Sequence, residues 1–255
     1  MLRKVRSISA FALAAFLLSL ALGMIPARVA SAGSSAGHVI INQFYGANYA
    51  YSPLSGRERA VRNAPVSHSF VELYNPTGED VDLTGWSLQY ADARNEWRKL
   101  DLEGVIPAGC SFLIRARATD LAKDGRLTVI QEGDMEWDAR FNSKGGKIVL
   151  LSNSSLISGD VANPSDSGGG PVGGYVDMLG AAGNDEGVND TIDGYETNFR
   201  AGQSKQKSLR RVGFKDTDNN AEDFALVDYR SPAAVEWAKP RRVSDGAWEA
   251  AGLRR

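Results

Sequence analysis

The hydrophobic residues of this chain fall into short runs in which apolar and polar positions alternate. The clearest run spans Phe70–Tyr90 and reads FVELYNPTGEDVDLTGWSLQY. Side chains alternate between the two faces of a strand, so segments 70–74, 81–84 and 86–90 each place apolar residues on one face. An Asn-Pro-Thr-Gly turn and a single glycine separate them. The pattern predicts three short strands, with Trp86 turned toward the interior.

Comparable runs recur along the rest of the chain. We expect further strands over residues 38–44, 97–100, 111–116, 127–131, 147–151, 175–179, 208–212 and 224–227. A short helical turn fits residues 116–123, and a hairpin-type turn fits residues 142–146. Several short strands separated by turn residues favour an all-β sandwich over alternating βα units.

The first 32 residues have the composition of a signal peptide. Three basic residues precede an apolar run over residues 8–25 and the small-residue segment 30–32. This order predicts export and cleavage after Ala32. An uncleaved anchor is the alternative, because the apolar run is nearly long enough to span a bilayer. No later stretch is apolar enough, so we expect no transmembrane segment in the mature chain.

The mature chain is acidic. The full chain has 29 Lys and Arg residues against 31 Asp and Glu residues. Four of the basic residues and none of the acidic ones lie in the first 32 positions, which leaves 25 against 31 and a net charge of −6. This balance argues against nucleic acid as a partner, because phosphate backbones are bound by clustered Lys and Arg.

The central run resembles the lamin tail domain of secreted bacterial proteins. The matching motifs are Glu72 within the first strand, the Asn75-Pro76 turn and the corner Leu83-Thr84-Gly85-Trp86. The block at residues 106–114 is similar to the next block of that family. The resemblance covers residues 38–151 well and continues more weakly to about residue 227. It implies an immunoglobulin-like β-sandwich, which in this family is usually a non-catalytic binding or attachment module.

These observations divide the chain into three parts. Residues 1–32 are the expected signal peptide, and residues 33–230 are the expected sandwich. Residues 231–255 contain two prolines and little periodicity, so we expect a peripheral tail with at most a helical turn over residues 247–253.

The connection Gly46–Ser69 is long and polar, with Tyr49, Tyr51 and three arginines. A solvated loop is the simpler interpretation of such a connection. Exposed aromatic and arginine side chains are also typical of recognition surfaces. The loop is therefore the best candidate in the sequence for a binding surface, with a cell-surface glycan or a protein as the partner.

Cys110 is the single cysteine of the chain, which excludes an intramolecular disulfide. It follows a Pro-Ala-Gly turn and precedes an apolar strand. A free cysteine in this setting is usually a small buried residue. An intermolecular bridge is the alternative.

Segment 166–171 reads DSGGGP and is similar to the nucleophile loop of trypsin-like proteases. That chemistry needs a histidine base oriented by an aspartate beside the serine. The chain has an extra glycine in the loop, and its only histidines, His38 and His68, lack the expected flanking sequence. A flexible surface loop explains the composition better.

Asp216, Asp218 and Asn220 alternate as in the first half of a calcium-binding loop, which uses oxygen ligands. The glycine of the sixth position and the glutamate of the twelfth are missing, since Ala221 and Val227 stand there. The pattern therefore excludes an EF-hand. An Asx turn is the favoured interpretation, and a calcium-stabilised structural module is the alternative.

A second acidic loop contains Asp185, Glu186, Asp190 and Asp193. Solvated loop charge is the simpler interpretation, although paired carboxylates in a cleft perform acid–base chemistry in hydrolases. The sequence carries no phosphate-binding or dinucleotide-binding motif and no Cys/His zinc pattern. We therefore expect an exported, non-catalytic module without catalytic residues, cofactor or metal, and the alternative is a secreted hydrolase with loop carboxylates.

Overall fold

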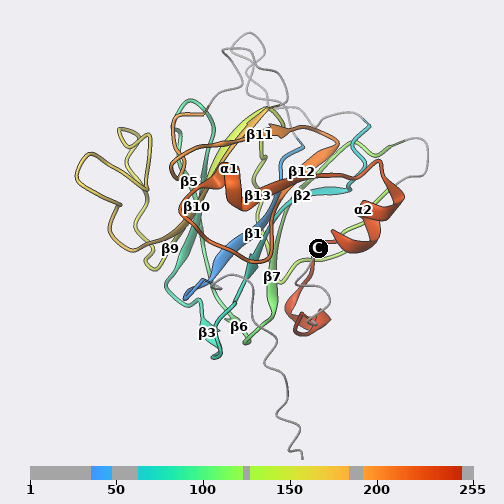
Figure 1. The fold of residues 1–255 in the computed structure, drawn as a ribbon, viewed down its shortest axis with the longest axis horizontal. Coiled ribbons are helices and arrows are strands. Elements are labelled where there is room, and N and C mark those ends of the chain that lie inside the picture. Colours follow the sequence, from blue (N-terminus) through green and yellow to red (C-terminus); the bar gives the residue numbers. More distant parts are fainter. Residues whose placement is uncertain (1–35, 48–62, 123–126, 184–191, 249–255) are drawn as a thin grey trace, which may run out of the picture. The chain divides into compact units, whose positions relative to one another are not determined.

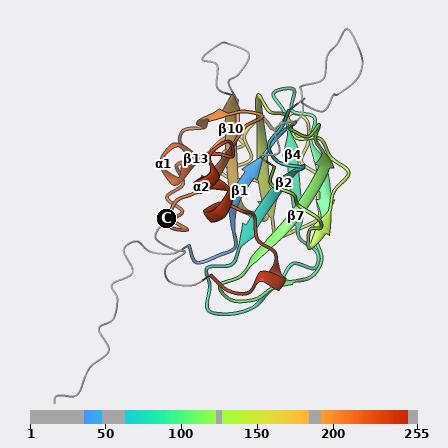
Figure 2. The same ribbon diagram turned by 90° about the vertical axis from the view of Figure 1, so that its right-hand side faces the viewer.

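The computed structural model describes residues 36–47, 63–122, 127–183 and 192–248, all of which belong to one compact unit. One sheet has six strands in the order β13-β12-β1-β2-β7-β8 (Figure 1). The strands of this sheet are β1 (Ile40–Tyr45), β2 (His68–Tyr74), β7 (Ser111–Ala118), β8 (Met135–Glu136), β12 (Lys207–Arg211) and β13 (Phe224–Asp228). Its central strands β1, β2 and β7 lie side by side in Figure 2.

A second sheet has five strands in the order β11-β10-β9-β4-β5. Its strands are β4 (Ser87–Ala91), β5 (Arg98–Asp101), β9 (Gly145–Leu151), β10 (Tyr175–Gly183) and β11 (Arg200–Gln203). A separate two-stranded ribbon pairs β3 (Val81–Asp82) with β6 (Val105–Ile106). Most pairs are antiparallel, while β7 and β8, and β10 and β11, run parallel.

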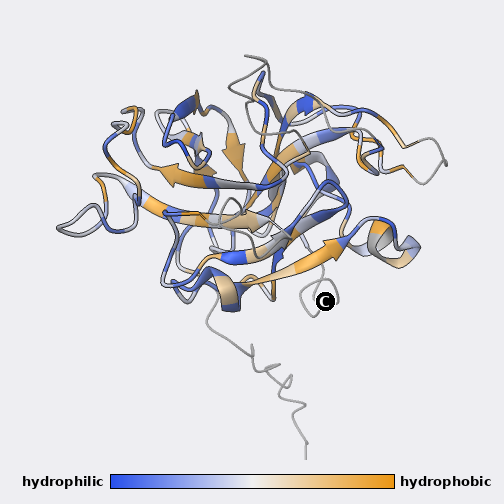
Figure 3. Cartoon of the chain, turned by 90° about the horizontal axis from the view of Figure 1, so that it is seen from above, coloured by the Kyte–Doolittle hydropathy of each residue, from blue (hydrophilic) through white to orange (hydrophobic). Residues whose placement is uncertain are grey.

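The main hydrophobic core lies between the two sheets. Phe44 and Leu73 of the six-stranded sheet belong to the same buried cluster as Leu88, Ile148 and Leu179 of the five-stranded sheet. Apolar residues follow the strands in Figure 3, as the alternating pattern requires. Burial of such side chains contributes roughly 25 cal/mol per Å². The arrangement is the predicted immunoglobulin-like β-sandwich.

The end of the chain packs against the sandwich. Helix α2 (Pro232–Trp237) is followed by residues 237–248, here called the C-terminal strap, which includes a short 3₁₀ turn, η1 (Val243–Asp245). Ala238 is fully buried in a second cluster with Tyr45, Phe70 and Leu113. The expected peripheral tail therefore has closer contacts with the sheet than its lack of periodicity indicated.

Two predicted elements are wrong, and one core residue is less buried than expected. Residues 127–131 form no ladder, because Thr128 makes only an isolated parallel bridge. The described part of the expected helical turn, residues 116–122, contains no helix, because β7 continues through Ala118. Trp86 is only partly buried against the main core, since it lies at the corner before β4.

The pattern also missed short strands. The bounds of β11 and of the two-residue strands β6 and β8 were not predicted, because such short strands carry too few alternating positions. No helix within the described ranges has the length and hydropathy needed to cross a membrane.

Candidate functional site

Arg211 of β12 organises a buried network of charged side chains between the sheets. Its guanidinium is fully buried and donates to both carboxylate oxygens of Asp177, at 2.8 and 2.9 Å. The same group lies 3.1 Å from Asp223 and 3.2 Å from Asp216. Arg211 Nε donates to the carbonyl of Ile41 at 3.0 Å. One cation thus joins carboxylates from β10, from α1 (Asn220–Asp223) and from the loop before it.

Glu196 extends this network toward Asn220. The side-chain amide of Asn220 donates to Glu196 Oε2 at 2.8 Å, and the hydroxyl of Tyr175 bonds the other carboxylate oxygen. Burial, with the nearby charge of Asp177, raises the pKa of Glu196 to about 9. Burial also raises the pKa of Asp177 to about 6, against the influence of Arg211. Glu196 therefore holds a proton at neutral pH.

Three of these carboxylates are close enough to bind a cation together. One oxygen each of Asp177, Glu196 and Asp216 lies within 4.8 Å of the others. Hard cations such as Ca²⁺ prefer sets of oxygen ligands, usually six to eight of them. Here the guanidinium of Arg211 already pairs with two of the three groups, and the third holds a proton. The arrangement is better suited to a buried ion-pair network than to a metal site.

Asp216, Asp218 and Asn220, the ligands of the calcium alternative, do not converge on one point. Asp216 belongs to the network, but Asp218 is exposed, with φ of 53°. The backbone N–H of Asp218 donates to Asp216 Oδ1 at 3.3 Å, which agrees with the favoured Asx turn. Asn220 is buried, and its Oδ1 accepts the N–H groups of Gly180 at 2.8 Å and Glu196 at 3.1 Å. Asn220 therefore ties α1 to β10.

The protease-like loop forms its hydrogen bonds within itself rather than with a histidine. The hydroxyl of Ser167 donates to the carbonyl of Gly170 at 2.9 Å. His38 forms an ion pair with Asp216 at 3.0 Å, and this hydrogen bond raises the pKa of His38. His68 contacts Ser67 at 2.9 Å. Neither histidine is hydrogen-bonded to Ser167, which agrees with the interpretation of segment 166–171 as a surface loop.

The remaining sequence candidates fall partly outside the described residues. Of the long connection 46–69, residues 48–62 and all of its named tyrosines and arginines lie outside. Of the second acidic loop, Asp193 is described, and it pairs with the buried Lys147 at 2.7 Å. Cys110 is free and buried, and burial raises the pKa of its thiol. This agrees with the simpler interpretation of Cys110 as a packed residue.

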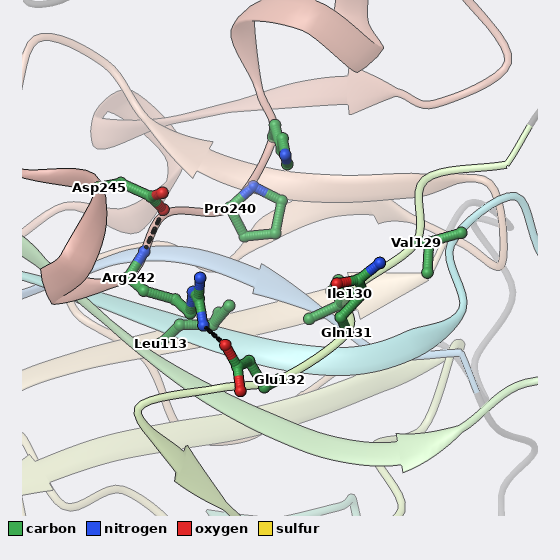
Figure 4. A pocket seen from close by; sticks show the side chains of 9 residues that line it. Leu113, Val129, Ile130, Gln131, Glu132, Pro240, Arg242 and Asp245 are labelled. Atoms are coloured by element: carbon green, nitrogen blue, oxygen red, sulfur yellow. Dashed lines mark hydrogen bonds and ion pairs between the residues drawn. The ribbon is translucent and has the colours of Figure 1, made fainter.

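A pocket between residues 129–132 and the C-terminal strap is a feature that the sequence did not indicate. Its cavity measures about 230 Å³, and Figure 4 shows the side chains that line it. Nine residues line it: Leu113, Val129, Ile130, Gln131, Glu132, Lys239, Pro240, Arg242 and Asp245. Neither the strap nor residues 129–132 show periodicity, so only their packing in three dimensions reveals this pocket.

The pocket has an aliphatic floor and a charged rim. Leu113 and Ile130 are 2% and 5% exposed, and Val129 is 51% exposed at the edge. Arg242 pairs with Glu132, and its backbone N–H donates to Asp245 at 2.8 Å, so these three charges satisfy one another (Figure 4).

The match to a family model agrees with the fold. The model of the Lamin Tail Domain family matches residues 32–165, and the chain belongs to this family. No curated protein matches this chain. A solved DUF4876 family protein from Bacteroides thetaiotaomicron is similar at 13% identity and a TM-score of 0.42, with 74% of this chain and 70% of that chain covered.

Proposed function

We propose that this chain is an exported, non-catalytic lamin-tail module that binds a partner protein outside the cell through the pocket under the C-terminal strap. The observation that carries the proposal is the pocket itself, with its aliphatic floor and charged rim. The occupant is a short segment of the partner with an aliphatic side chain and a carboxylate.

The size and lining of the pocket support this class of ligand. Sites for drug-sized molecules usually measure roughly 300–1,000 Å³. A cavity of about 230 Å³ therefore suits one side chain with its neighbouring backbone. Leu113, Ile130 and Pro240 give the floor apolar contacts, and the lining contains no aromatic ring on which a sugar would stack. A protein segment is thus favoured over a glycan.

Lys239 supports the choice of an acidic group. Arg242 is already paired with Glu132, whereas Lys239 is exposed at the pocket and is bonded to none of the lining carboxylates. An exposed ammonium beside an apolar floor attracts a carboxylate of the ligand and contributes modestly, on the order of 1 kcal/mol or less.

The buried carboxylates outside the pocket are already paired, which supports a non-catalytic role. Asp177, Asp216 and Asp223 pair with Arg211, and Glu196 bonds Tyr175 and Asn220. The carboxylates do converge, as the hydrolase alternative requires, but they do so inside the sandwich rather than in a cleft. These groups are engaged in holding the sheets together.

Titration of the isotope-labelled mature chain with N-acetyl-leucine tests the pocket, because this probe has both required groups. We expect millimolar binding with NMR shifts at Leu113, Ile130 and Lys239. N-acetyl-leucinamide, which lacks the carboxylate, is the matched ligand control. Lys239→Gln weakens the binding of the acid several-fold and leaves the amide unaffected. Shifts spread over the surface, or equal binding of acid and amide, contradict the proposal.

Export has its own test. We expect a bacterial host expressing the whole chain to release a protein whose mass corresponds to residues 33–255, since the leader ends in small residues. The variant Ala32→Arg blocks cleavage and serves as the control. Recovery of the uncleaved chain in the membrane fraction supports the anchor alternative instead.

A cation-stabilised module is the second candidate function, and the convergence of Asp177, Glu196 and Asp216 favours it. If calcium binds the folded state and not the unfolded state, it raises the melting temperature by mass action. The two candidates therefore differ in whether calcium or the leucine derivative stabilises the protein.

A further inference from the structure

A row of side chains crosses the outer face of the six-stranded sheet beneath the C-terminal strap. Gln43 of β1 pairs in register with Arg210 of β12 on one side and with Glu72 of β2 on the other. Glu72 pairs in turn with Leu113 of β7, which lines the pocket. Residues directly opposite each other in a sheet point to the same face. Glu72 therefore lies next to the pocket floor, and it is fully buried.

The carboxyl group of Glu72 is bonded through one oxygen only. Glu72 Oε1 accepts the side-chain amide of Asn42 at 3.1 Å and the hydroxyl of Ser111 at 2.6 Å. Glu72 Oε2 and Asn42 Oδ1 are both buried and both lack a hydrogen-bond partner. Two buried acceptors without donors are costly, because each has lost its hydrogen bonds to water and gained none in the protein. They belong to two side chains that are already joined by a hydrogen bond.

A single proton resolves both deficits. We propose that Glu72 is a neutral carboxylic acid in the folded protein, and that its Oε2–H donates to Asn42 Oδ1 to complete a cyclic acid–amide pair. The β-bulge between Ile41 and Gln43 permits this pairing, because it turns the extra residue, Asn42, to the same side as Glu72. Burial favours the neutral form and raises the pKa of Glu72.

Two of the groups that face Glu72 favour its ionised form, and burial opposes them. The charge of Arg210 on β12 and the backbone N–H of Arg241 on the strap lower the pKa of Glu72, whereas burial raises it more strongly, and the neighbouring Tyr229 does not compensate a charge. Arg210, however, directs its guanidinium to the strap. It donates to the carbonyl of Trp237 at 2.7 Å and lies 4.8 Å from the centre of the Trp248 ring.

The neutral acid also fixes one wall of the pocket. The indole N–H of Trp248 donates to Ser111 Oγ at 2.8 Å, and Ser111 donates to Glu72. This chain of hydrogen bonds ties the end of the strap to the sheet, while strap residues Lys239 and Pro240 line the pocket. Glu72 is therefore a positioning residue for the pocket wall. This consequence rests on the proposed function, whereas the protonation of Glu72 does not.

The carboxyl ¹³C shift of Glu72 in the labelled wild-type protein tests the protonation directly, with the signal assigned by its loss in Glu72→Gln. We expect the shift of a protonated acid at pH 7, with a change to the carboxylate only at alkaline pH. The protection of the Trp248 indole N–H, measured relative to its intrinsic base-catalysed exchange rate, is expected to fall over the same pH interval. A carboxylate shift at pH 7 overturns the proposal.

Two variants provide the matched control. The substitution Glu72→Gln reproduces the neutral acid, because the amide N–H that it introduces replaces Oε2–H as the donor to Asn42. This variant therefore keeps Trp248 protected at every pH. Glu72→Ala removes the acid–amide pair with Asn42. The indole N–H of Trp248 then loses its protection even at low pH.

The same variants also separate the protonation from the proposed function. If Glu72→Gln exposes Trp248 at pH 7, Glu72 acts there as a charged partner of Arg210, and the acid–amide pair is refuted. Failure of the wild-type protein to bind N-acetyl-leucine, with Glu72 protonated at pH 7, contradicts only the proposed function.

Discussion

Arg211 is the residue on which the buried charges of the sandwich depend. Its guanidinium contacts Asp177, Asp216 and Asp223, and its side chain is 0% exposed. Removal of one member of a buried ion pair leaves the partners uncompensated and costs roughly 3–5 kcal/mol. The three carboxylates make Arg211 more costly to remove than an isolated partner.

We expect Arg211→Met to lower the free energy of unfolding by about 3–5 kcal/mol, measured by urea denaturation at pH 7. Methionine fills most of the volume but provides no charge. Arg230→Met is the matched control, because Arg230 is 59% exposed in its pair with Asp228, and exposed pairs contribute about 0–1 kcal/mol. Equal effects of the two substitutions contradict the structural role of the network.

Glu196 makes stability depend on pH. Its pKa rises from 4.5 to about 9 in the folded protein, so the folded state binds a proton that the unfolded state releases. The resulting stabilisation is fully present below pH 4.5 and is lost progressively as the pH rises through about 9.

Glu196→Gln removes this dependence, because the amide keeps both hydrogen-bond partners and cannot ionise. We expect the variant to gain stability relative to wild type between about pH 5 and pH 8, by at least about 1 kcal/mol, the value of roughly one pKa unit. Urea denaturation at both pH values measures the difference. A constant difference between the two proteins contradicts a raised pKa of Glu196 in the folded state.

At the scale of elements, the loop before α1 supports the fold through turns rather than through calcium. Asp218 is exposed, and its backbone forms an Asx turn on Asp216. Asn220 connects α1 with β10 by hydrogen bonds to Met178 and Gly180. We therefore expect neither calcium nor a chelator to change the melting temperature of the mature chain.

Substitutions in this loop give a second check at the same scale. Asp218→Asn keeps the backbone conformation, since Asn also tolerates a positive φ, and we expect a stability change within about 0.5 kcal/mol. Asn220→Ala leaves the N–H groups of Gly180 and Glu196 without their acceptor and costs about 1–3 kcal/mol. A melt that responds to calcium supports the cation-stabilised module instead.

The corner at Trp86 gives a prediction about the core. Trp86 is partly buried, whereas Leu88 on the following strand is fully buried in the main cluster. Leu→Ala substitutions at buried positions cost about 2–5 kcal/mol. We expect Trp86→Ala to cost less, about 1–2 kcal/mol, despite the larger side chain. Thermal melts of the Trp86→Ala and Leu88→Ala variants test this difference. A larger loss of stability for Trp86→Ala contradicts the observed burial.

At the scale of the whole molecule, the sandwich could be predicted from alternation and family motifs. Val71 and Leu73 share the inner face as expected, and Glu72 points to the outer one. Turn residues placed most strand bounds within a few positions. Residues 127–131 were mistaken for a strand, because they are apolar enough for one but lie beside the sheet without pairing along it.

The sites were much less predictable than the fold. Arg211 meets Asp177 across 34 positions in the sequence, and Trp248 meets Ser111 across 137. No local pattern encodes such contacts. The acidic motif at residues 216–220 did locate one member of the buried network, Asp216. The favoured Asx turn is present, whereas the ligand set of the calcium alternative does not form, because Asp218 is exposed and Asn220 bonds Glu196 and the backbone of Gly180.

A thermal melt of residues 33–255 with N-acetyl-leucine, compared with calcium and with a chelator, tests the account most directly. A ligand that binds only the folded state stabilises it by about 1.4 kcal/mol at roughly ten times its dissociation constant. We predict a higher melting temperature with N-acetyl-leucine, a smaller rise in Lys239→Gln, and no effect of calcium or chelator. A melt that responds to calcium and ignores the leucine derivative contradicts the account.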